Sequence, residues 1–293
     1  MKPIWEFISE ADWLRHVDAA LQEDLGKGEE YGDHSSLACF SPDAQGLGTL
    51  RAKASGVVAG LSLIPSLWRH IDPLVQWVPS VEDGARVDPG TVLGTARGSV
   101  LTLLKAERTL LNYIQRLSGI ATQTQDYVSL VEGTGVVLLD TRKTTPGWRA
   151  LEKWAVQVGG GSNHRMGLYD YVMLKDNHID AVGSLTEAVK RTELYLQTKR
   201  LKRGIEVEVR TLTEVDEALQ VPAITRIMLD NFSPEACRQA VETVAGRLET
   251  EASGGITAES LRAYAESGVT FISIGALTHS VKSMDIHFKV QPL

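Results

Sequence analysis

Basic side chains gather after two short apolar segments in the middle of the chain, residues 136–139 and 171–174. Five of the basic side chains in this region could converge at one site: Arg142, Lys143, His164, Arg165 and Lys175. Arginine forks pair bidentately with carboxylate or phosphate groups, and lysine adds a compact point charge. If these side chains converge in space, they form a binding site for a multiply charged anion.

Glycine-containing turns follow two further apolar segments, at Ser253-Gly254-Gly255 and at Gly275-Ala276. Turns of this kind let backbone N–H groups approach an anion closely, as in the phosphate sites found between a strand and a helix. These turns therefore indicate a phosphate group on the expected ligand.

Acidic side chains also occur in this pattern. Glu206 and Glu208 are two residues apart in "IEVEV", so on a strand they face the same side. A carboxylate inside a dry barrel is costly unless a cation or a metal ion pairs with it. Together with Asp230, these carboxylates suit Mg²⁺, which prefers a few carboxylates plus substrate phosphates. The polar residues as a group predict a phosphorylated substrate with additional anionic groups.

An alternation of short apolar strands and helices places these side chains. Strands are expected at residues 136–139, 171–174, 205–209, 226–229, 248–253 and 269–274. Helices are expected from near Pro146 to 158 and at 184–198, 212–219, 233–245 and 257–266. This rhythm indicates parallel β/α units, in an open doubly wound sheet or in a barrel. In either architecture the ligand site lies at the carboxyl ends of the strands, where the reactive side chains fall.

Residues 1 to about 115 are organised differently. A helix is expected from Ser9, whose side chain can form a capping box with Asp12, to a stop at Gly26. Short β-like pieces punctuated by Asp-Gly and Pro-Gly turns follow, then an amphipathic helix over 99–117. Ser118-Gly119 is expected to interrupt that helix, with a second one beginning behind it.

Composition excludes several classes of protein. The chain has 293 residues, is 43% hydrophobic and 23% charged, and carries a net charge of −7. This balance is typical of an ordinary globular protein and disfavours a nucleic-acid-binding surface. Two distant cysteines, the lack of a signal-peptide pattern and the lack of a long apolar run predict a cytoplasmic protein with no membrane partner.

An ordered set of motifs resembles the quinolinate phosphoribosyltransferases, also called nicotinate-nucleotide pyrophosphorylases (carboxylating). The segments are "AERTLLNYIQRLSGIATQT", "DTRKTTPGWRALEKWAV", "GGGSNHRMGL", "KDNH", "EVEV", "LDN", "EASGGI" and "GALTHS". The resemblance covers nearly the whole chain. A departure falls in "EDLGKGEEYGDHSS", where a short insertion changes the loop at 26–36.

The resemblance implies an α/β fold of the type II phosphoribosyltransferase kind. It would have an N-terminal α/β sandwich domain at 1–117 and an open α/β barrel of about six parallel strands at 118–279, with residues 280–293 packing back on the first domain. It implies a homodimer with shared active sites, and the sequence leaves open whether this dimer assembles further into a hexamer. The implied reaction joins quinolinate and 5-phosphoribosyl-1-pyrophosphate to give nicotinate mononucleotide, CO₂ and pyrophosphate in NAD biosynthesis, with Mg²⁺ as cofactor.

The family's site residues carry over to named positions in this sequence. Quinolinate carboxylates would be bound by Arg142, His164 and Arg165, with Arg108 reaching in from the partner subunit. Lys143 and Lys175 would act in catalysis and meet substrate anions beside Thr141. Glu208 and Asp230 would be the catalytic, metal-side carboxylates. The 5′-phosphate cradle would comprise Ser253, Gly254, Gly255, Gly275, Ala276 and His279. Glu206 is expected to make a structural ion pair instead.

Three rival interpretations come from other classes. The pyrophosphorylase-like relatives associated with molybdenum transport, which act on a different acceptor, share "DTRKT" but typically lack the Lys-Asp-Asn-His segment that stands at 175–178. The stretch at 81–98 resembles a lipoyl-type carrier module but contains no lysine to carry the cofactor. A purely structural barrel would not need paired carboxylates and cations at one rim.

Overall fold

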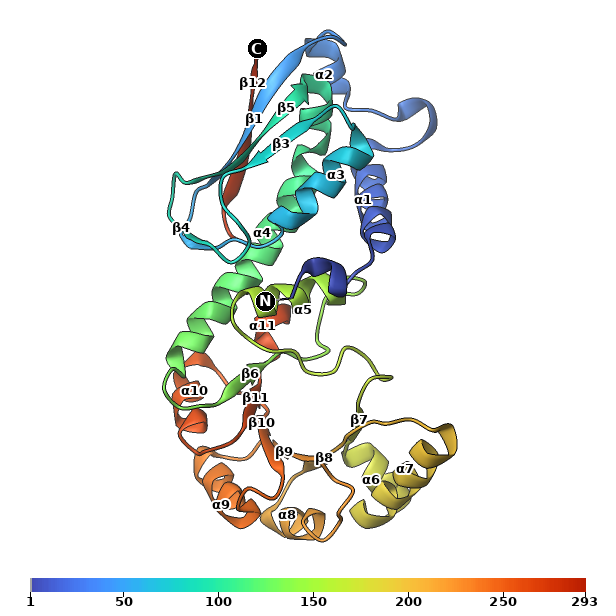
Figure 1. The fold of residues 1–293 in the computed structure, drawn as a ribbon, viewed down its shortest axis with the longest axis vertical. Coiled ribbons are helices and arrows are strands. Elements are labelled where there is room, and N and C mark those ends of the chain that lie inside the picture. Colours follow the sequence, from blue (N-terminus) through green and yellow to red (C-terminus); the bar gives the residue numbers. More distant parts are fainter. Residues whose placement is uncertain (1) are drawn as a thin grey trace. The chain divides into compact units, whose positions relative to one another are not determined.

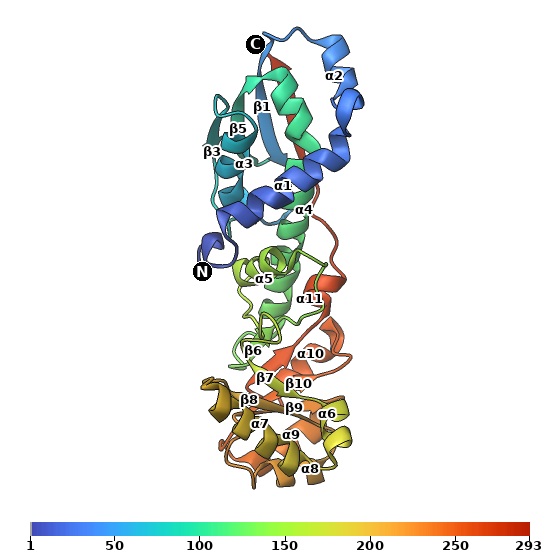
Figure 2. The same cartoon turned by 90° about the vertical axis from the view of Figure 1, so that its right-hand side faces the viewer.

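A computed structural model describes residues 2–293 and divides the chain into two compact units (Figures 1 and 2). The first unit comprises Met1–Gln125, Thr145–Gly160 and Ser280–Leu293, and the second comprises Asp126–Thr144 and Gly161–His279. None of the helices within residues 2–293 is both long enough and apolar enough to cross a membrane.

An antiparallel sheet organises the first unit, with strand order β12-β1-β5-β3. Its strands are β1 (Gln45–Ala52), β3 (Gln76–Pro79), β5 (Val92–Ser99) and β12 (Ile286–Pro292). The C-terminal strand β12 pairs with β1 over its whole length, from Gly46 opposite Pro292 to Ala52 opposite Ile286. A second, two-stranded sheet joins β2 (Gly56–Val57) and β4 (Arg86–Val87).

Helices cover one face of the four-stranded sheet (Figures 1 and 2). They include α1 (Glu10–Leu25), α3 (Ile64–Ile71) and α4 (Val100–Leu130), and short turns of 3-10 helix lie at Ile4–Glu6, Gly28–Glu30 and Leu61–Leu63. The predicted cap of α1 is present, because Ser9 Oγ accepts the backbone N–H of Asp12 at 3.1 Å. The inserted loop leads into another short helix, α2 (His34–Cys39), whose N-cap is Asp33.

The predicted break at Ser118-Gly119 is wrong, since α4 runs unbroken through both residues. Gly119 is needed for close packing instead, because a Cβ there would lie 2.4 Å from the backbone oxygen of Lys282. Ser118 Oγ accepts the backbone N–H of Ala59 at 3.0 Å. The small residues that suggested a helix stop thus mark a place where neighbouring chain segments approach the helix.

Helix α5 (Arg149–Val158) belongs to the first unit, although its sequence lies between two barrel strands. It begins later than Pro146, because Gly147 adopts a positive φ of 82°. Trp148 stacks on Tyr113 of α4 with ring centroids 4.5 Å apart. Glu152, which is fully buried, receives Arg116 Nη2 at 2.9 Å. Aromatic stacking and a buried ion pair therefore fix α5 against α4.

Six parallel strands form the sheet of the second unit, in the order β6-β11-β10-β9-β8-β7. They are β6 (Val137–Leu139), β7 (Val172–Leu174), β8 (Ile205–Val209), β9 (Arg226–Asp230), β10 (Glu249–Ser253) and β11 (Phe271–Ser273). Strands β6 and β7 are the two edges, so the predicted open barrel of six strands is confirmed.

Helices α6 to α10 line the outer side of this curved sheet (Figure 1). Their bounds are α6 (Asp176–Val182), α7 (Leu185–Lys199), α8 (Leu212–Ala218), α9 (Pro234–Val244) and α10 (Ala258–Ala265), with α11 (Ala276–His279) following β11. All five residues of β8 are buried. Since side chains alternate along a strand, Glu206 and Glu208 face the side opposite to Ile205, Val207 and Val209. The polar side chains are thereby directed to the inside of the barrel.

Candidate active site

A cavity of about 650 Å³ lies at the carboxyl ends of the barrel strands. Most of the site residues predicted from the sequence line it: Thr141, Arg142, Lys143, His164, Arg165, Lys175, Glu208, Asp230, Ser253, Gly254, Gly255, Gly275, Ala276 and His279. Arg108 does not, and is an exposed residue of α4 in the first unit. The volume suits a ligand of the size of a nucleotide.

The segment after β6 is held by hydrogen bonds to its main chain. Thr141 Oγ1 accepts the backbone N–H of Lys143 at 3.0 Å, and Thr278 Oγ1 donates to the carbonyl of Lys143 at 2.9 Å. The neighbouring side chains of Arg142 and Lys143 remain exposed. A fixed backbone with exposed cationic side chains is the arrangement expected at an anion-binding rim.

The segment that carries His164 is anchored by a buried carboxylate. Asp140 is fully buried at the end of β6, and its oxygens accept the N–H of His164 at 2.9 Å and the Nδ2 group of Asn163 at 2.6 Å. Charge-assisted bonds of this kind are stronger than neutral ones. Asp140 therefore fixes this segment against the strand that precedes Arg142.

Arg165 enters the same cavity and lies near another cation. Its Nη1 donates to the carbonyl of Tyr171 at 3.2 Å. Burial, followed by the nearby charge of Arg142, lowers the pKa of Arg165 from its ordinary value. Two guanidinium groups that repel each other across a pocket are stabilised when an anion lies between them. The pair is thus suited to a ligand carboxylate or phosphate.

Opposite charges meet on the next wall. Lys175, directly after β7, donates from Nζ to Glu208 on β8, and Asp230 follows on β9 with its Oδ2 accepting from Asn231. Both carboxylates face the cavity, and the donor set consists of oxygen atoms only. Such a set fits Mg²⁺, which binds through one or two carboxylates and fills its remaining positions with water and phosphate.

Two glycine positions shape the opposite rim. Gly254 adopts a positive φ of 101°, and a Cβ there would lie 2.2 Å from Oδ1 of Asn231. At Gly275 a Cβ would approach the His279 ring to 3.0 Å and Cδ of Lys143 to 3.1 Å. Side chains at either position would fill the turn, so the glycines keep the main chain accessible to an anion.

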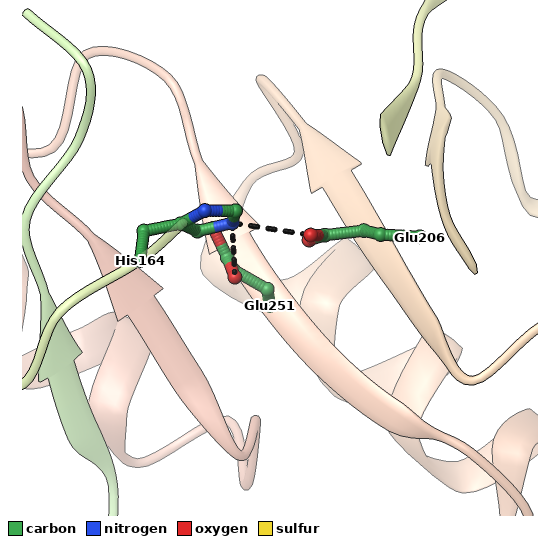
Figure 3. A group of neighbouring side chains, drawn as sticks. All are labelled: His164, Glu206 and Glu251. Atoms are coloured by element: carbon green, nitrogen blue, oxygen red, sulfur yellow. Dashed lines mark ion pairs between the residues drawn. The ribbon is translucent and has the colours of Figure 1, made fainter. Parts of the chain in front are cut away.

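A second layer of charge lies beneath the cavity floor. Nε2 of His164 lies 3.1 Å from Oε2 of Glu206 on β8 and 3.4 Å from Oε2 of Glu251 on β10 (Figure 3). Both glutamates are fully buried. Figure 3 shows both carboxylates beside this ring nitrogen, and since neither contact has hydrogen-bond geometry, they share it as an ion-pair partner. Nη1 of Arg226 on β9 completes the layer, 3.1 Å from Glu251.

The titration of this layer follows from its burial. Burial lowers the pKa of His164, but the bonds and charges of Glu206 and Glu251 outweigh it and raise the pKa to about 9. Burial raises the pKa of Glu206; it would do the same for Glu251, but His164, Ser273 and Arg226 hold that pKa below its usual range. The two carboxylates therefore favour a proton on the ring nitrogen that faces them.

The position of that proton follows from a hydrogen bond. The backbone N–H of Arg165 donates to Nδ1 of His164 at 2.7 Å. An imidazolium would need its own proton at Nδ1, where this N–H points. We therefore place the ring proton on Nε2, beside Glu206 and Glu251, although the raised pKa of His164 taken alone would describe an imidazolium.

Comparison with known proteins identifies the family. A model of the N-terminal domain of quinolinate phosphoribosyl transferase matches residues 33–118, and a model of its C-terminal domain matches residues 120–289. The chain belongs to the quinolinate phosphoribosyltransferase family. The chloroplastic nicotinate-nucleotide pyrophosphorylase [carboxylating] of Arabidopsis thaliana is 44% identical over 290 residues, covering 94% of this chain and 81% of that protein.

Bacterial members of the quinolinate phosphoribosyltransferase family are similar to the same extent. The probable nicotinate-nucleotide pyrophosphorylase [carboxylating] of Bacillus subtilis is 44% identical over 271 residues, covering 92% of this chain and 90% of its own. The crystal structure of NadC from Streptococcus pyogenes superposes with a TM-score of 0.91 at 38% identity, covering 98% of this chain and 99% of that one.

Reasoning from the sequence did not find every residue of this quinolinate phosphoribosyltransferase site. Additional cavity-lining residues are Met173, Met228, Asn231, Ile256, Thr257, Ser273 and Ile274. The buried partners Arg226 and Glu251 were also missed. Glu251 had a detectable signal, because "ETEAS" places acidic residues at alternate positions of a strand just as "IEVEV" does.

Proposed function

We propose that this chain transfers the phosphoribosyl group of 5-phosphoribosyl-1-pyrophosphate to quinolinate and removes one carboxyl group. The products are nicotinate mononucleotide, CO₂ and pyrophosphate, as for a nicotinate-nucleotide pyrophosphorylase (carboxylating) of NAD biosynthesis. Membership of the quinolinate phosphoribosyltransferase family supports this reaction.

One observation carries the proposal at the level of the site. The barrel gathers four cationic side chains, two carboxylates and two glycine turns around one cavity. The cations are Arg142, Lys143, Arg165 and Lys175. This combination matches a dicarboxylate and a sugar phosphate that carries a pyrophosphate group, because each of these needs several charge-assisted donors.

The residues have distinct tasks in this proposal. Arg142 and Arg165 bind the quinolinate carboxylates and hold the ring nitrogen near the anomeric carbon, which turns an encounter into a positioned reaction. As the nitrogen–carbon bond forms, the bond from that carbon to pyrophosphate breaks. Lys143 and Lys175 stabilise the negative charge that collects on the leaving oxygens. The glycine turns and His279 bind the 5′-phosphate through main-chain N–H groups and the imidazole.

Decarboxylation follows from the charge of the product ring. Once the pyridine nitrogen is quaternary, the electron pair of the breaking carbon–carboxyl bond is stabilised by the ring, CO₂ departs, and the ring carbon takes up a proton. The step needs no organic cofactor. The contribution of the protein is to hold the ring in place with Arg142 and Arg165 while this happens.

Glu208 and Asp230 are the residues we propose for Mg²⁺, which when bound would supply charge stabilisation for the pyrophosphate. Lys175 now contacts Glu208, so a cation already neutralises this carboxylate. Asp230→Asn is expected to raise the Mg²⁺ concentration for half-maximal turnover. Asp216→Asn, on the exposed side of α8, is the matched control. An unchanged Mg²⁺ titration in Asp230→Asn removes Asp230 from the metal site.

A homodimer with shared sites is the second part of the proposal, and Arg108 is its test residue. Arg108 lies on α4 and does not line the cavity of its own chain. The wild-type chain is first assayed for quinolinate-dependent release of CO₂ and pyrophosphate. Arg108→Ala and Lys143→Ala are each expected to be inactive. In an equal mixture of the two variants, chance pairing makes about half of the dimers mixed, and each mixed dimer has one complete site, so about a quarter of all sites should be active.

Recovery in the mixture supports a site completed by the partner. Absence of recovery, with subunit exchange demonstrated by differently tagged chains, argues against it. If the wild-type chain itself shows no quinolinate-dependent turnover, the proposed reaction is wrong. A cytoplasmic location remains a prediction from the sequence, which leaves assembly into a hexamer open.

A further inference from the structure

The buried layer beneath the cavity has a feature that stability does not require. Glu206 and Glu251 are both fully buried, and replacement of buried ion networks by apolar side chains is often neutral or stabilising. Within residues 2–293, no hydrogen-bond donor is aligned with either oxygen of Glu206, although Nε2 of His164 lies 3.1 Å away. The carboxylate is therefore directed at the imidazole and at little else.

The imidazole in turn connects this layer to the cavity wall. On one side its Nε2 lies between the two carboxylates, as Figure 3 shows, and on the other side its Nδ1 accepts the backbone N–H of Arg165. Both ring nitrogens are thus engaged by the chain's own groups. Rotation of the ring would break the contact to the main chain of Arg165.

We propose that Glu206 and Glu251 are positioning residues for quinolinate binding, which orient the imidazole of His164 so that it fixes the main chain of Arg165 at the cavity wall. Arg226 supports them by pairing with Glu251 from the neighbouring strand. This inference rests on the proposed contact between Arg165 and a quinolinate carboxylate. It assigns His164 the role of a link between the buried layer and Arg165.

A transition-metal site is the alternative use of the same groups. Nε2 of His164 and one oxygen of each glutamate lie within 4.8 Å of one another, and their ligand types suit such an ion. However, Arg226 already supplies positive charge 3.1 Å from Glu251. We therefore infer a hydrogen-bonded positioning layer, and a metal becomes an outcome of the test.

Two substitutions at Glu206 test the length of its side chain and its charge separately. Glu206→Gln keeps the length and an acceptor oxygen but loses the charge, and its amide can donate to Oε1 of Glu251, which lacks a hydrogen-bond partner among residues 2–293. Glu206→Asp keeps the charge but is one methylene shorter. Glu206→Gln is expected to retain a KM for quinolinate near the wild-type value, whereas Glu206→Asp is expected to raise it about tenfold by losing the contact with Nε2.

Other kinetic constants distinguish positioning from general damage. The KM for 5-phosphoribosyl-1-pyrophosphate and the kcat are expected to stay near wild type in both variants, because the changed contact fixes Arg165 only. Glu249→Gln is the control, since Glu249 contacts the same Arg226 from the exposed side. If Glu206→Asp fails to fold, Glu206→Met replaces it, because methionine keeps the length and offers no strong acceptor.

The ¹⁵N NMR signals of the His164 ring give a readout that does not depend on turnover. Wild type and Glu206→Gln are expected to show a protonated Nε2 and an accepting Nδ1, and Glu206→Asp a mixture of tautomers. A raised KM for quinolinate in Glu206→Gln with a normal KM in Glu206→Asp would show that quinolinate binding depends on the charge of residue 206 and not on the length of its side chain. This result would overturn the proposal. So would a wild-type protein that loses quinolinate affinity when a chelator removes a bound transition metal. If the proposed reaction is wrong, the wild-type chain will show no turnover, and the NMR experiment will still report the tautomer of His164.

Discussion

The barrel carries two layers of charged side chains, and they differ in what they contact. In the upper layer, Arg142, Lys143 and Lys175 face a cavity and are at least partly exposed. In the lower layer, Glu206 and Glu251 are fully buried and meet His164 and Arg226 of the same chain. Glu206 and Glu208, two residues apart on β8, are both buried, but Glu208 lines the cavity and Glu206 does not.

The difference shows how one strand serves binding and folding at once. Charges at the rim keep much of their hydration until a ligand arrives, so they can be removed at little cost to folding. Charges in the lower layer are buried and not hydrated, so each is tolerated only while its ion-pair partner is present. Removal of a residue should therefore cost stability in the lower layer, whereas in the upper layer it should weaken ligand binding with little change in stability.

The largest effect is expected from Arg226→Met. This change leaves Glu251 without its guanidinium and also removes the stacking of Arg226 on Phe271, whose ring centroid is 3.9 Å away. Loss of one partner from a buried ion network costs about 3–5 kcal/mol. Urea denaturation followed by circular dichroism measures the loss, with Arg191→Met as a control from an exposed helical pair. A cost below about 1 kcal/mol would mean that the two layers do not differ in this way.

Arg142→Ala is expected to act on affinity instead. Hydrogen bonds to charged groups contribute about 1.5–3 kcal/mol, so the KM for quinolinate should rise by about 10-fold to 150-fold. The urea midpoint should stay close to that of wild type, because the side chain is exposed. Lys190→Ala, which removes an exposed charge from α7, should change neither quantity. An unaltered KM in Arg142→Ala would exclude it from the upper layer's function.

Much of the upper layer was predictable from the sequence, because it depends on local order along the chain. Polar residues directly after an apolar strand lie at one edge of a parallel sheet whatever the strand order is, so Arg142, Lys175 and Asp230 could be grouped before any coordinates. The period of the apolar residues likewise gave strand β8 with its bounds, Ile205–Val209.

The pairing of residues within the lower layer was not predictable, because it depends on which strands are neighbours and in what register. Arg226 aligns with Glu206 on one side and Glu249 on the other only in the observed pairing of β8, β9 and β10. The assignment of α5 to the first unit depends in the same way on the distant contact between Trp148 and Tyr113. Gly119 misled because a glycine that permits close packing has the same sequence signal as one that ends a helix.

The smallest effect is expected from Glu249→Gln. This change compares an exposed and a buried carboxylate that pair with the same guanidinium, that of Arg226. Arg226 Nη2 lies 3.0 Å from Glu249, whose side chain is 51% exposed, and Nη1 lies 3.1 Å from Glu251, whose side chain is fully buried. Glu249 also accepts a bond from Nε of Arg226 at 3.2 Å, so a smaller energy for this pair would come from its exposure and not from poorer geometry. An exposed pair contributes about 0–1 kcal/mol and is screened by salt.

Glu249→Gln should therefore lower the urea midpoint slightly at about 0.1 M salt, and the difference from wild type should vanish near 1 M, where the Debye length is about 3 Å. The KM for quinolinate should not change, since Glu249 is not directed at His164. A loss as large as that of Arg226→Met, persisting at high salt, would mean that Glu249 belongs to the buried layer after all. Membership of the lower layer would then be decided by a hydrogen bond to Arg226 and not by the burial of the residue that bonds to it.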